Sequence, residues 1–404
     1  MTSHDDLVTF PFPRPAGDPL GQPTQFREMR EKGSAVRVRT WDGCPYVVTR
    51  HAAARDVFSD GEHFSADPSK PGFSERNAGF AQSVGLDRNF RTMDGEDHVA
   101  QRALVGEDFS RRRLNLLKPF VAEVAEQLIE TASDGVREFD IVEKVAFPLS
   151  ITVLCELLGV PKADRAYFQR RVNSAVSPRP DEAATAGAEL TKYMGALVRE
   201  KSDDPGDDVL SRLAIKVGEG VITVDQAVSI GRMLLVGGFE TTANTIGLGV
   251  LALLSHSDQR KLFMTHLDDE KFVANAVNEL IRYCPVQQNG QRRVAVSDVQ
   301  IGEVEVRPGD GIICANGAAN FDERVFQDPY RLDLTRTNAS AHLGFGFGPH
   351  SCIAQSLARM ELTACFTTLL RRLPTLQLVH EPALLPTKNR DDLAFGVREL
   401  LVTW

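Results

Sequence analysis

The sequence lacks paired cysteines, an excess of basic residues and an apolar N-terminal run, features that mark disulfide-rich or zinc proteins, nucleic-acid-binding proteins and membrane proteins. Its six cysteines form no CxxC pair and no zinc-type spacing, which argues against a disulfide framework or a structural zinc site and favours a reducing cytoplasm. Basic side chains number 46 against 55 acidic ones, so binding of nucleic acid through its phosphates is not expected. The N-terminus lacks both a signal-peptide apolar core and a run of about 20 apolar residues, and we therefore expect a soluble protein without a membrane anchor.

Internal repeats, low-complexity tracts and composition shifts that would mark a linker are also missing. The 404 residues are 42% hydrophobic and 25% charged, which is ordinary for a globular protein. We therefore expect one continuous domain over residues 1–404, with a proline-rich arm at residues 1–15.

The hydrophobic patterns predict a mainly α protein with small β-sheets. β-prone runs at 36–38 and 46–49 indicate a small sheet, the region from 96 to about 254 is helical, and short strands are expected between 294 and 306. An irregular stretch at 321–340 precedes a last helix. Ser65 to Asn89 is too long and too rich in Gly, Ser, Pro and Asn for an ordinary connector; it is either a plain surface loop or a functional wall.

The string FGFGPHSC, residues 345–352, places Cys352 on a glycine-rich loop directly before a helical pattern. Backbone N–H groups and the helix dipole favour a thiolate there, as a soft metal ligand requires. A lone buried cysteine is more often a core residue, but the glycines and His350 favour the ligand. The string resembles the cysteine loop of the cytochrome P450 family, in which the thiolate is the proximal ligand of haem b. Ala354 departs from the glycine usual at that position, and the resemblance places Phe345 against the proximal side of the ring.

A second string, GGFETT at Gly237–Thr242, interrupts an apolar helix that is predicted from a capping box at Thr223 to about Ser255. Roughly 33 residues at about 1.5 Å each would cross a whole domain. Two glycines and a buried carboxylate in a helix interior lower the stability of the helix. Either a tight packing contact needs the small residues, or a cofactor lies against them and a threonine hydroxyl opens the helix locally. By resemblance Glu240 and Thr241 form the family's acid–alcohol pair, which relays the protons of dioxygen activation, and Gly238 lies beside the haem.

Two further pairs match family motifs. Glu279 and Arg282 lie three residues apart, which alone indicates only a weak surface pair; by resemblance they are the structural ExxR pair. His98 and Arg102 lie four residues apart, where a solvated polar face is the ordinary interpretation; by resemblance they bind haem propionates. The resemblance adds Arg293 and His350 as further propionate partners.

The resemblance implies the cytochrome P450 fold, with haem between a long distal helix and the cysteine-ligand helix. It also implies a haem-thiolate monooxygenase that hydroxylates or oxidatively couples a small organic molecule in secondary metabolism. Two external electrons would come from a ferredoxin and a ferredoxin reductase. The protein is expected to be a cytoplasmic monomer. Arg111–Arg113 and Arg359 form either a docking face for the ferredoxin or a solvated surface.

Three other functions stay open at this point: a nitric-oxide reductase-like enzyme that draws hydride from NADH, a haem sensor of diatomic gases, and a helical protein without haem. Substrate contacts are expected from positions on the distal helix, after the ExxR helix and near the C-terminus, namely Met233, Val236, Phe239, Val286, Gln288, Asn289 and Phe395. The run Gln287–Asn289 hints at a peptide-like or polyketide substrate with hydrogen-bonding groups. Alternatively, these amides satisfy strand backbone groups.

Overall fold

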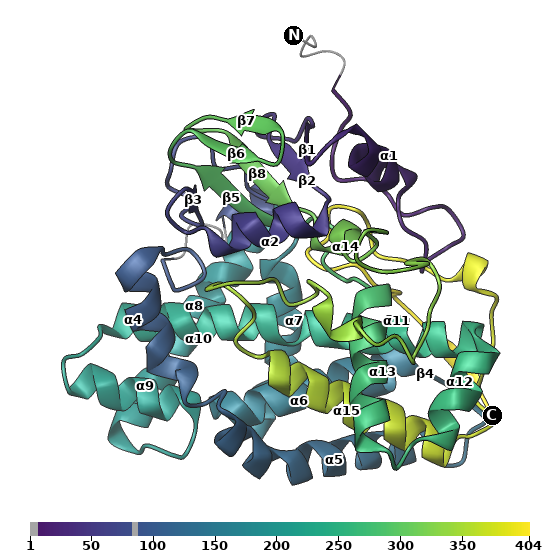
Figure 1. Cartoon of the computed structure of the whole chain (residues 1–404). Coiled ribbons are helices and arrows are strands. Elements are labelled where there is room, and N and C mark those ends of the chain that lie inside the picture. Colours follow the sequence, from purple (N-terminus) through teal and green to yellow (C-terminus); the bar gives the residue numbers. More distant parts are fainter. Residues whose placement is uncertain (1–6, 83–87) are drawn as a thin grey trace.

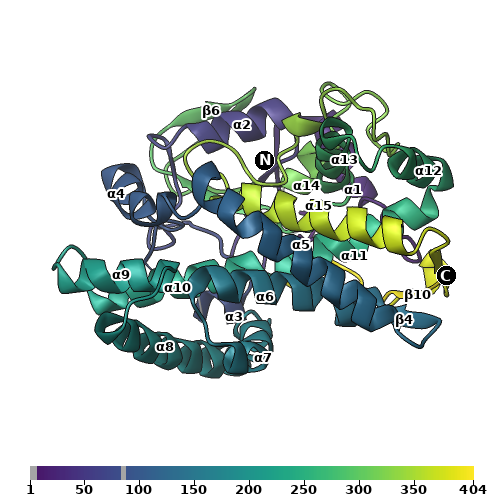
Figure 2. The same ribbon diagram turned by 90° about the horizontal axis from the view of Figure 1, so that it is seen from below.

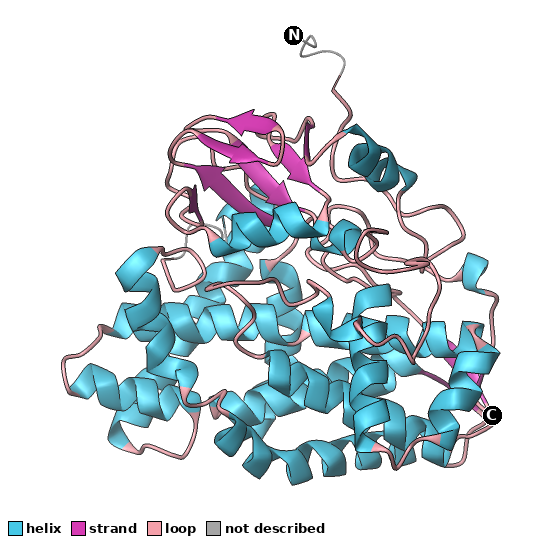
Figure 3. Cartoon of the chain, viewed as in Figure 1, coloured by secondary structure: helices cyan, strands magenta, loops and turns pink. Residues whose placement is uncertain are grey.

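The computed structural model describes residues 7–82 and 88–404. Most strands gather at one corner of the molecule, a smaller group lies near the C-terminus, and helices fill the rest (Figures 1 and 3). The helices are α1 (Thr24–Lys32), α2 (His51–Ser59), α3 (Ala78–Phe80), α4 (Gly95–Gly106), α5 (Arg111–Ser133), α6 (Phe147–Leu158), α7 (Arg165–Ala175), α8 (Pro180–Asp203), α9 (Val209–Gly218), α10 (Val224–Gly238), α11 (Glu240–Ser255), α12 (Ser257–Thr265), α13 (Glu270–Tyr283), α14 (Asn316–Ala319) and α15 (Gln355–Arg372). The predicted mainly helical class is confirmed.

Three small sheets accompany the helices. Their strands are β1 (Ala35–Arg37), β2 (Tyr46–Val48), β3 (Phe64–Ser65), β4 (Glu138–Asp140), β5 (Gln291–Ala295), β6 (Val299–Ile301), β7 (Val304–Val306), β8 (Gly311–Cys314), β9 (Gln377–Leu378) and β10 (Leu401–Thr403). The largest sheet has the order β1-β2-β8-β5-β3, in which only the β2–β8 pairing is parallel. All four residues of β8 are buried, as a central strand requires. The sequence analysis predicted β1, β2 and the strands near 294–306 but missed β3, β4, β8, β9 and β10.

The long apolar helix exists, with one interruption. Thr223 caps α10 through the predicted capping box with Gln226, and α10 and α11 are separated only by Phe239. Residues Val224–Ser255 are long and apolar enough to cross a membrane, but 83% of the most apolar window is buried inside the protein. Figure 2 shows α10 and α11 following one another through the helical part. The helix is therefore the central core element that its composition predicted.

Two hydrophobic clusters meet along this helix. One joins α11 with α5, α13 and α15, and the other joins α10 with α6, α8 and α9. Packing of α15 against α5 and α11 places the segment that follows Cys352 beside the distal helix. The fold thus brings the two chemically informative strings of the sequence to opposite sides of one space.

Candidate active site

The loop before α15 is bent so that its cysteine reaches the interior. Gly346 and Gly348 both adopt φ of 70°, a region that side chains disfavour, and a Cβ on Gly348 would lie 2.4 Å from the carbonyl oxygen of Phe58. The Cys352 N–H donates to the Phe345 carbonyl at 2.8 Å, which closes the loop. The positive φ favours glycine at both positions, and at Gly348 the close approach of the Phe58 backbone also excludes a side chain.

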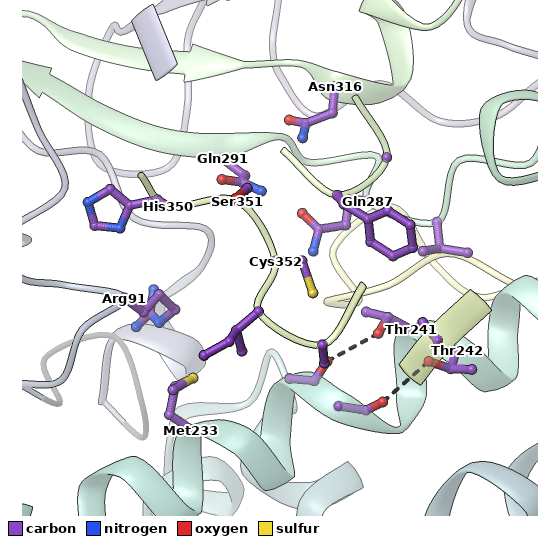
Figure 4. Close-up of a pocket in the computed structure, with 18 of the residues that line it drawn as sticks. Arg91, Met233, Thr241, Thr242, Gln287, Gln291, Asn316, His350, Ser351 and Cys352 are labelled. Carbon is purple, nitrogen blue, oxygen red and sulfur yellow. Dashed lines mark hydrogen bonds between the residues drawn. The ribbon is translucent and has the colours of Figure 1, made fainter. Parts of the chain in front are cut away.

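Cys352 and the distal helix line one cavity of about 250 Å³. Figure 4 shows the Cys352 thiol between the His350–Ser351 loop and the Thr241–Thr242 turn. The predicted site residues among its walls are Arg102, Met233, Gly238, Thr241, Val286, Arg293, Phe345, His350 and Cys352. Residues of the 65–89 segment also line it, so this segment is a wall of the cavity and not a plain surface loop.

The centre of the distal helix is notched. Apart from its two chain neighbours and the backbone of its own helix, no described atom lies within 4 Å of the position that a Cβ on Gly237 would occupy. The Thr241 Oγ1 donates to the Gly237 carbonyl at 3.1 Å, and the Thr242 Oγ1 donates to the Gly238 carbonyl at 3.4 Å, the back-bonding that the sequence predicted. Gly238 also serves packing, because its Cβ would lie 2.9 Å from the Leu154 side chain of α6. Open space therefore faces Gly237 more than Gly238.

The acid of the GGFETT string does not line the cavity. Glu240 Oε1 forms an ion pair with Lys388, and the exposed fractions of the two side chains are 7% and 12%. Glu240 Oε2 has no hydrogen-bond partner in the described part of the chain. The prediction of a carboxylate beside the iron needs this correction: the backbone of residue 240 is at the notch, but its side chain turns to the C-terminal segment. The sequence offered no signal for Lys388, which lies 148 residues away.

Three cationic or donor side chains surround the cysteine side of the cavity. Arg102 donates to the Ser351 carbonyl at 2.8 Å, whereas Arg293 keeps its buried Nη2 without a partner among the described residues. Burial, followed by nearby Arg293 and His98, lowers the pKa of His350 to about 2, so this imidazole is neutral. Burial also raises the pKa of the Cys352 thiol, and the Ala354 N–H and two arginines oppose that rise.

His98 does not line the cavity. Its ring nitrogens lie 2.7 Å from the Phe90 carbonyl oxygen and 3.2 Å from the Pro349 carbonyl oxygen, and its ring centre is 4.0 Å from that of His350. The structure therefore connects His98 to the cysteine loop. Direct contact with a propionate, predicted for His98 by resemblance, is not what this arrangement provides.

The ExxR pair is fully buried. Arg282 donates to both carboxylate oxygens of Glu279, at 2.7 and 2.9 Å, and to the Asn320 and Pro329 carbonyls of the irregular segment. Arg336, which sequence reasoning missed, donates to Glu279 at 3.1 Å. The pair thus fixes the segment before the cysteine loop, in keeping with its predicted structural role.

Several predicted substrate contacts lie elsewhere. In the described chain, the cavity walls do not include Val236, Phe239, Gln288, Asn289 or Phe395. Phe239 packs on an aromatic ring of α6 with centroids 5.9 Å apart. Gln288 and Asn289 donate to carbonyls of the 389–392 segment, so these two amides do satisfy backbone groups, but those of a turn and not of a strand as the alternative expected.

Most of the arginines expected to dock a ferredoxin already interact with side chains of this protein. Arg112 and Arg113 form ion pairs with acidic side chains at 2.6 Å. The Arg359 guanidinium lies 4.6 Å from the centre of the Phe345 ring and donates to Asn278 at 2.9 Å. Arg359 therefore supports the cysteine loop and is not a free surface charge.

Sequence reasoning also missed much of the polar wall. Cavity-lining polar residues without a sequence prediction are Glu75, Arg76, Arg91, Thr242, Thr245, Gln291, Arg292, Asn316 and Ser351. They come from the 65–89 segment, which we call the roof segment, from the residues that follow it, and from α11, β5, α14 and the cysteine loop, which share no motif spacing. Only the fold brings them together.

The donor set fits haem. A thiol faces the cavity from one side, open space at Gly237 faces it from the other, and the unpartnered Nη2 of Arg293 offers a buried donor for a propionate. A metal deprotonates a coordinating thiol outright, so the raised pKa of Cys352 does not prevent ligation. Arg102, Arg293 and His350 would hold the propionates and Cys352 the iron.

Known proteins resemble the chain over its whole length. The family model described as Cytochrome P450 matches residues 185–399. Cytochrome P450 CYP105Q4 of Mycobacterium marinum is 41% identical and covers 98% of this chain and 96% of its own. The crystal structure of GfsF, a cytochrome P450 of Streptomyces halstedii, superposes with a TM-score of 0.90 at 38% identity, covering 98% of this chain and all of the other.

A third similar protein is named for its activity. Mycinamicin VIII C21 methyl hydroxylase of Micromonospora griseorubida, solved with mycinamicin VIII bound, has a TM-score of 0.90 at 32% identity and covers 98% of this chain and 100% of its own. These comparisons confirm the predicted fold, the haem b cofactor and the monooxygenase activity in secondary metabolism. With a cysteine loop and a notched distal helix around one cavity, the chain belongs to the cytochrome P450 family.

Proposed function

We propose that this enzyme inserts one atom of dioxygen into a C–H bond of a secondary metabolite, as a cytoplasmic single-domain protein supplied with electrons by a ferredoxin and its reductase. The observation that carries the proposal is the placement of the Cys352 thiol and the Gly237–Thr241 notch around one cavity. Bound haem supplies the reductive activation of dioxygen, and the cysteine thiolate promotes cleavage of the O–O bond. Side chains of the protein deliver protons, exclude water and orient the substrate.

Thr241 is the group that holds a proton at the notch. Its hydroxyl now donates to the Gly237 carbonyl, so its oxygen is free to accept a hydrogen bond from the side of the cavity. Glu240, next in the chain, is paired with Lys388 at the outer side of the helix. We infer that the Glu240 carboxylate turns away from Lys388, takes up a proton from solvent and passes that proton to Thr241 Oγ1.

The walls of the cavity exclude water and orient the substrate. Met233, Val286 and Phe73 supply apolar surface, and Gln287 has a buried Oε1 without a partner among the described residues. The names of two similar proteins state natural products as their substrates, mycinamicin VIII for one and 20-oxo-5-O-mycaminosyltylactone for the other. A natural product of comparable class is therefore the proposed substrate.

Turnover with isotopically labelled dioxygen tests the proposal. Purified holoenzyme, a surrogate ferredoxin and reductase, NADPH and a panel of natural products should yield a product that carries one labelled oxygen atom. Thr241→Ala should divert most reducing equivalents to hydrogen peroxide. Thr185→Ala should not, because Thr185 makes the same type of back-bond, 2.9 Å to the Asp181 carbonyl, on an exposed helix.

Two results would contradict the proposal. Consumption of nitric oxide with NADH as the direct donor, without any oxygenated product, would indicate a nitric-oxide reductase. Gas binding without turnover under every electron supply would indicate a sensor.

A further inference from the structure

A charged cluster lies in the cavity wall away from the cysteine. Glu75 and Arg76 belong to the segment that follows β3, Arg292 belongs to β5, and all three line the cavity. We call these three residues the roof cluster. Glu75 is held in place because its N–H donates to Asp42 at 2.7 Å and its carbonyl accepts from the Trp41 indole at 3.0 Å. The cluster is therefore a fixed part of the wall.

The arginines of the roof cluster have unused donors. Arg76 Nε and Nη1 and Arg292 Nε are buried and have no hydrogen-bond partner within the described ranges. Burial lowers the pKa of Arg76 to about 10 and that of Arg292 to about 9, with the charge of Arg76 also contributing to the second shift. Both side chains remain cations at neutral pH. Buried donors without partners are costly, which indicates that a missing group satisfies them.

The geometry of β5 indicates that the haem propionates do not satisfy these donors. Arg292 and Arg293 are neighbours on a strand, so their side chains point to opposite faces. The Arg292 guanidinium lies 5.8 Å from the centre of the Phe10 ring, whereas that of Arg293 lies 5.6 Å from the Phe58 ring. Arg293 therefore faces the part of the cavity that would hold haem, and Arg292 faces Glu75 and Arg76, the other members of the roof cluster.

The charges of the cluster define what it would bind. The negative charge of Glu75 acts on both guanidinium groups, so the three side chains carry one net positive charge; their unpartnered buried atoms are three arginine donors and Glu75 Oε2. We propose that Arg76 and Arg292 bind a carboxylate of the substrate, so that the natural product oxidised by this enzyme is an organic acid. This inference rests on the proposed function and names its substrate class.

Ligands anchored on the haem iron provide a test that needs no turnover. Imidazol-1-yl alkanoic acids of graded chain length and their methyl esters bind iron through the imidazole, and the Soret shift of the holoenzyme reports their affinity. At the best length the acid should bind at least about tenfold more tightly than its ester, because a charge-assisted pair of hydrogen bonds replaces a neutral contact. Equal affinity of acid and ester at every length would overturn the proposal and indicate a neutral substrate.

Variants assign the preference to the cluster. Arg76→Gln and Arg292→Gln should each reduce the preference for the acid to about twofold or less and leave the affinity of the ester unchanged, which also shows that the cavity is intact. Arg88→Gln is the matched control, because Arg88 is exposed and pairs with Asp97. A preference that survives both cluster variants would refute the assignment. Failure of oxygen insertion would be seen separately, since ligand binding requires no electrons.

Discussion

The ion pair between Glu240 and Lys388 gives the sharpest prediction about the distal helix. Both side chains are almost completely buried, so Lys388→Met leaves a carboxylate without a cation and should lower the free energy of unfolding by about 3–5 kcal/mol. Glu240→Gln should cost less, about 1 kcal/mol, because the lysine stem can carry its amine to water. In the double variant both charges are gone, and we expect a total loss of about 2 kcal/mol and hence a coupling of about 2–4 kcal/mol.

Urea unfolding of the holoenzyme, followed by far-ultraviolet circular dichroism, measures this cycle. The exposed pair Arg371–Asp268, with an N–O distance of 2.6 Å, is the matched control and should show a coupling below about 0.5 kcal/mol. If the losses at 240 and 388 simply add, the pair does not hold the carboxylate and the reasoning fails. Turnover offers a second readout, because Lys388→Met should also change the fraction of electrons lost to hydrogen peroxide.

Three other substitutions test the packing around the site. Burial raises the pKa of Glu361 well above 4.5, so the native state holds a proton that the unfolded state releases. Between pH 4.5 and that raised pKa, the free energy of unfolding of the wild type should therefore fall with rising pH, by about 1.4 kcal/mol per pH unit more than that of Glu361→Gln. Urea unfolding at several pH values measures this difference. Gly238→Ala should destabilise by about 1 kcal/mol, and thermal unfolding should show no such cost in a Leu154→Ala background, where the added methyl has room. Arg336→Met should cost about 3 kcal/mol in urea unfolding, and less than Arg282→Met, since the buried carboxylate would keep one cation; equal losses would contradict the network described.

The parts of the fold that sequence could predict are those with local causes. The capping box at Thr223 and the back-bonding of Thr241 depend on residues within four positions of one another, and the glycine turn before Cys352 depends on residues within seven; the structure shows all three. Strand β8 was missed because its short apolar run becomes a strand only between β2 and β5. The pairing with β2 joins residues more than 200 positions apart, such as Tyr46 and Ile312.

The direction of a side chain was the least predictable property. Glu240 was assigned to the proton relay by resemblance to the family's acid–alcohol pair with Thr241, yet adjacent helical positions point about 100° apart. Which way Glu240 turned was decided by Lys388, and no pattern in the sequence connects the two. The same reason explains why Arg76 and Arg292 were overlooked: their importance arises only where the roof segment crosses β5.

The break at Phe239 has an electrostatic consequence. A continuous helix concentrates its partial charges at two distant ends, whereas an interruption gives the interior an additional amino end and carboxyl end. Glu240 lies in the first turn of α11, where the new amino end carries partial positive charge. The interruption that makes room beside Gly237 therefore also creates, in the centre of the protein, a backbone field that favours an anion at residue 240.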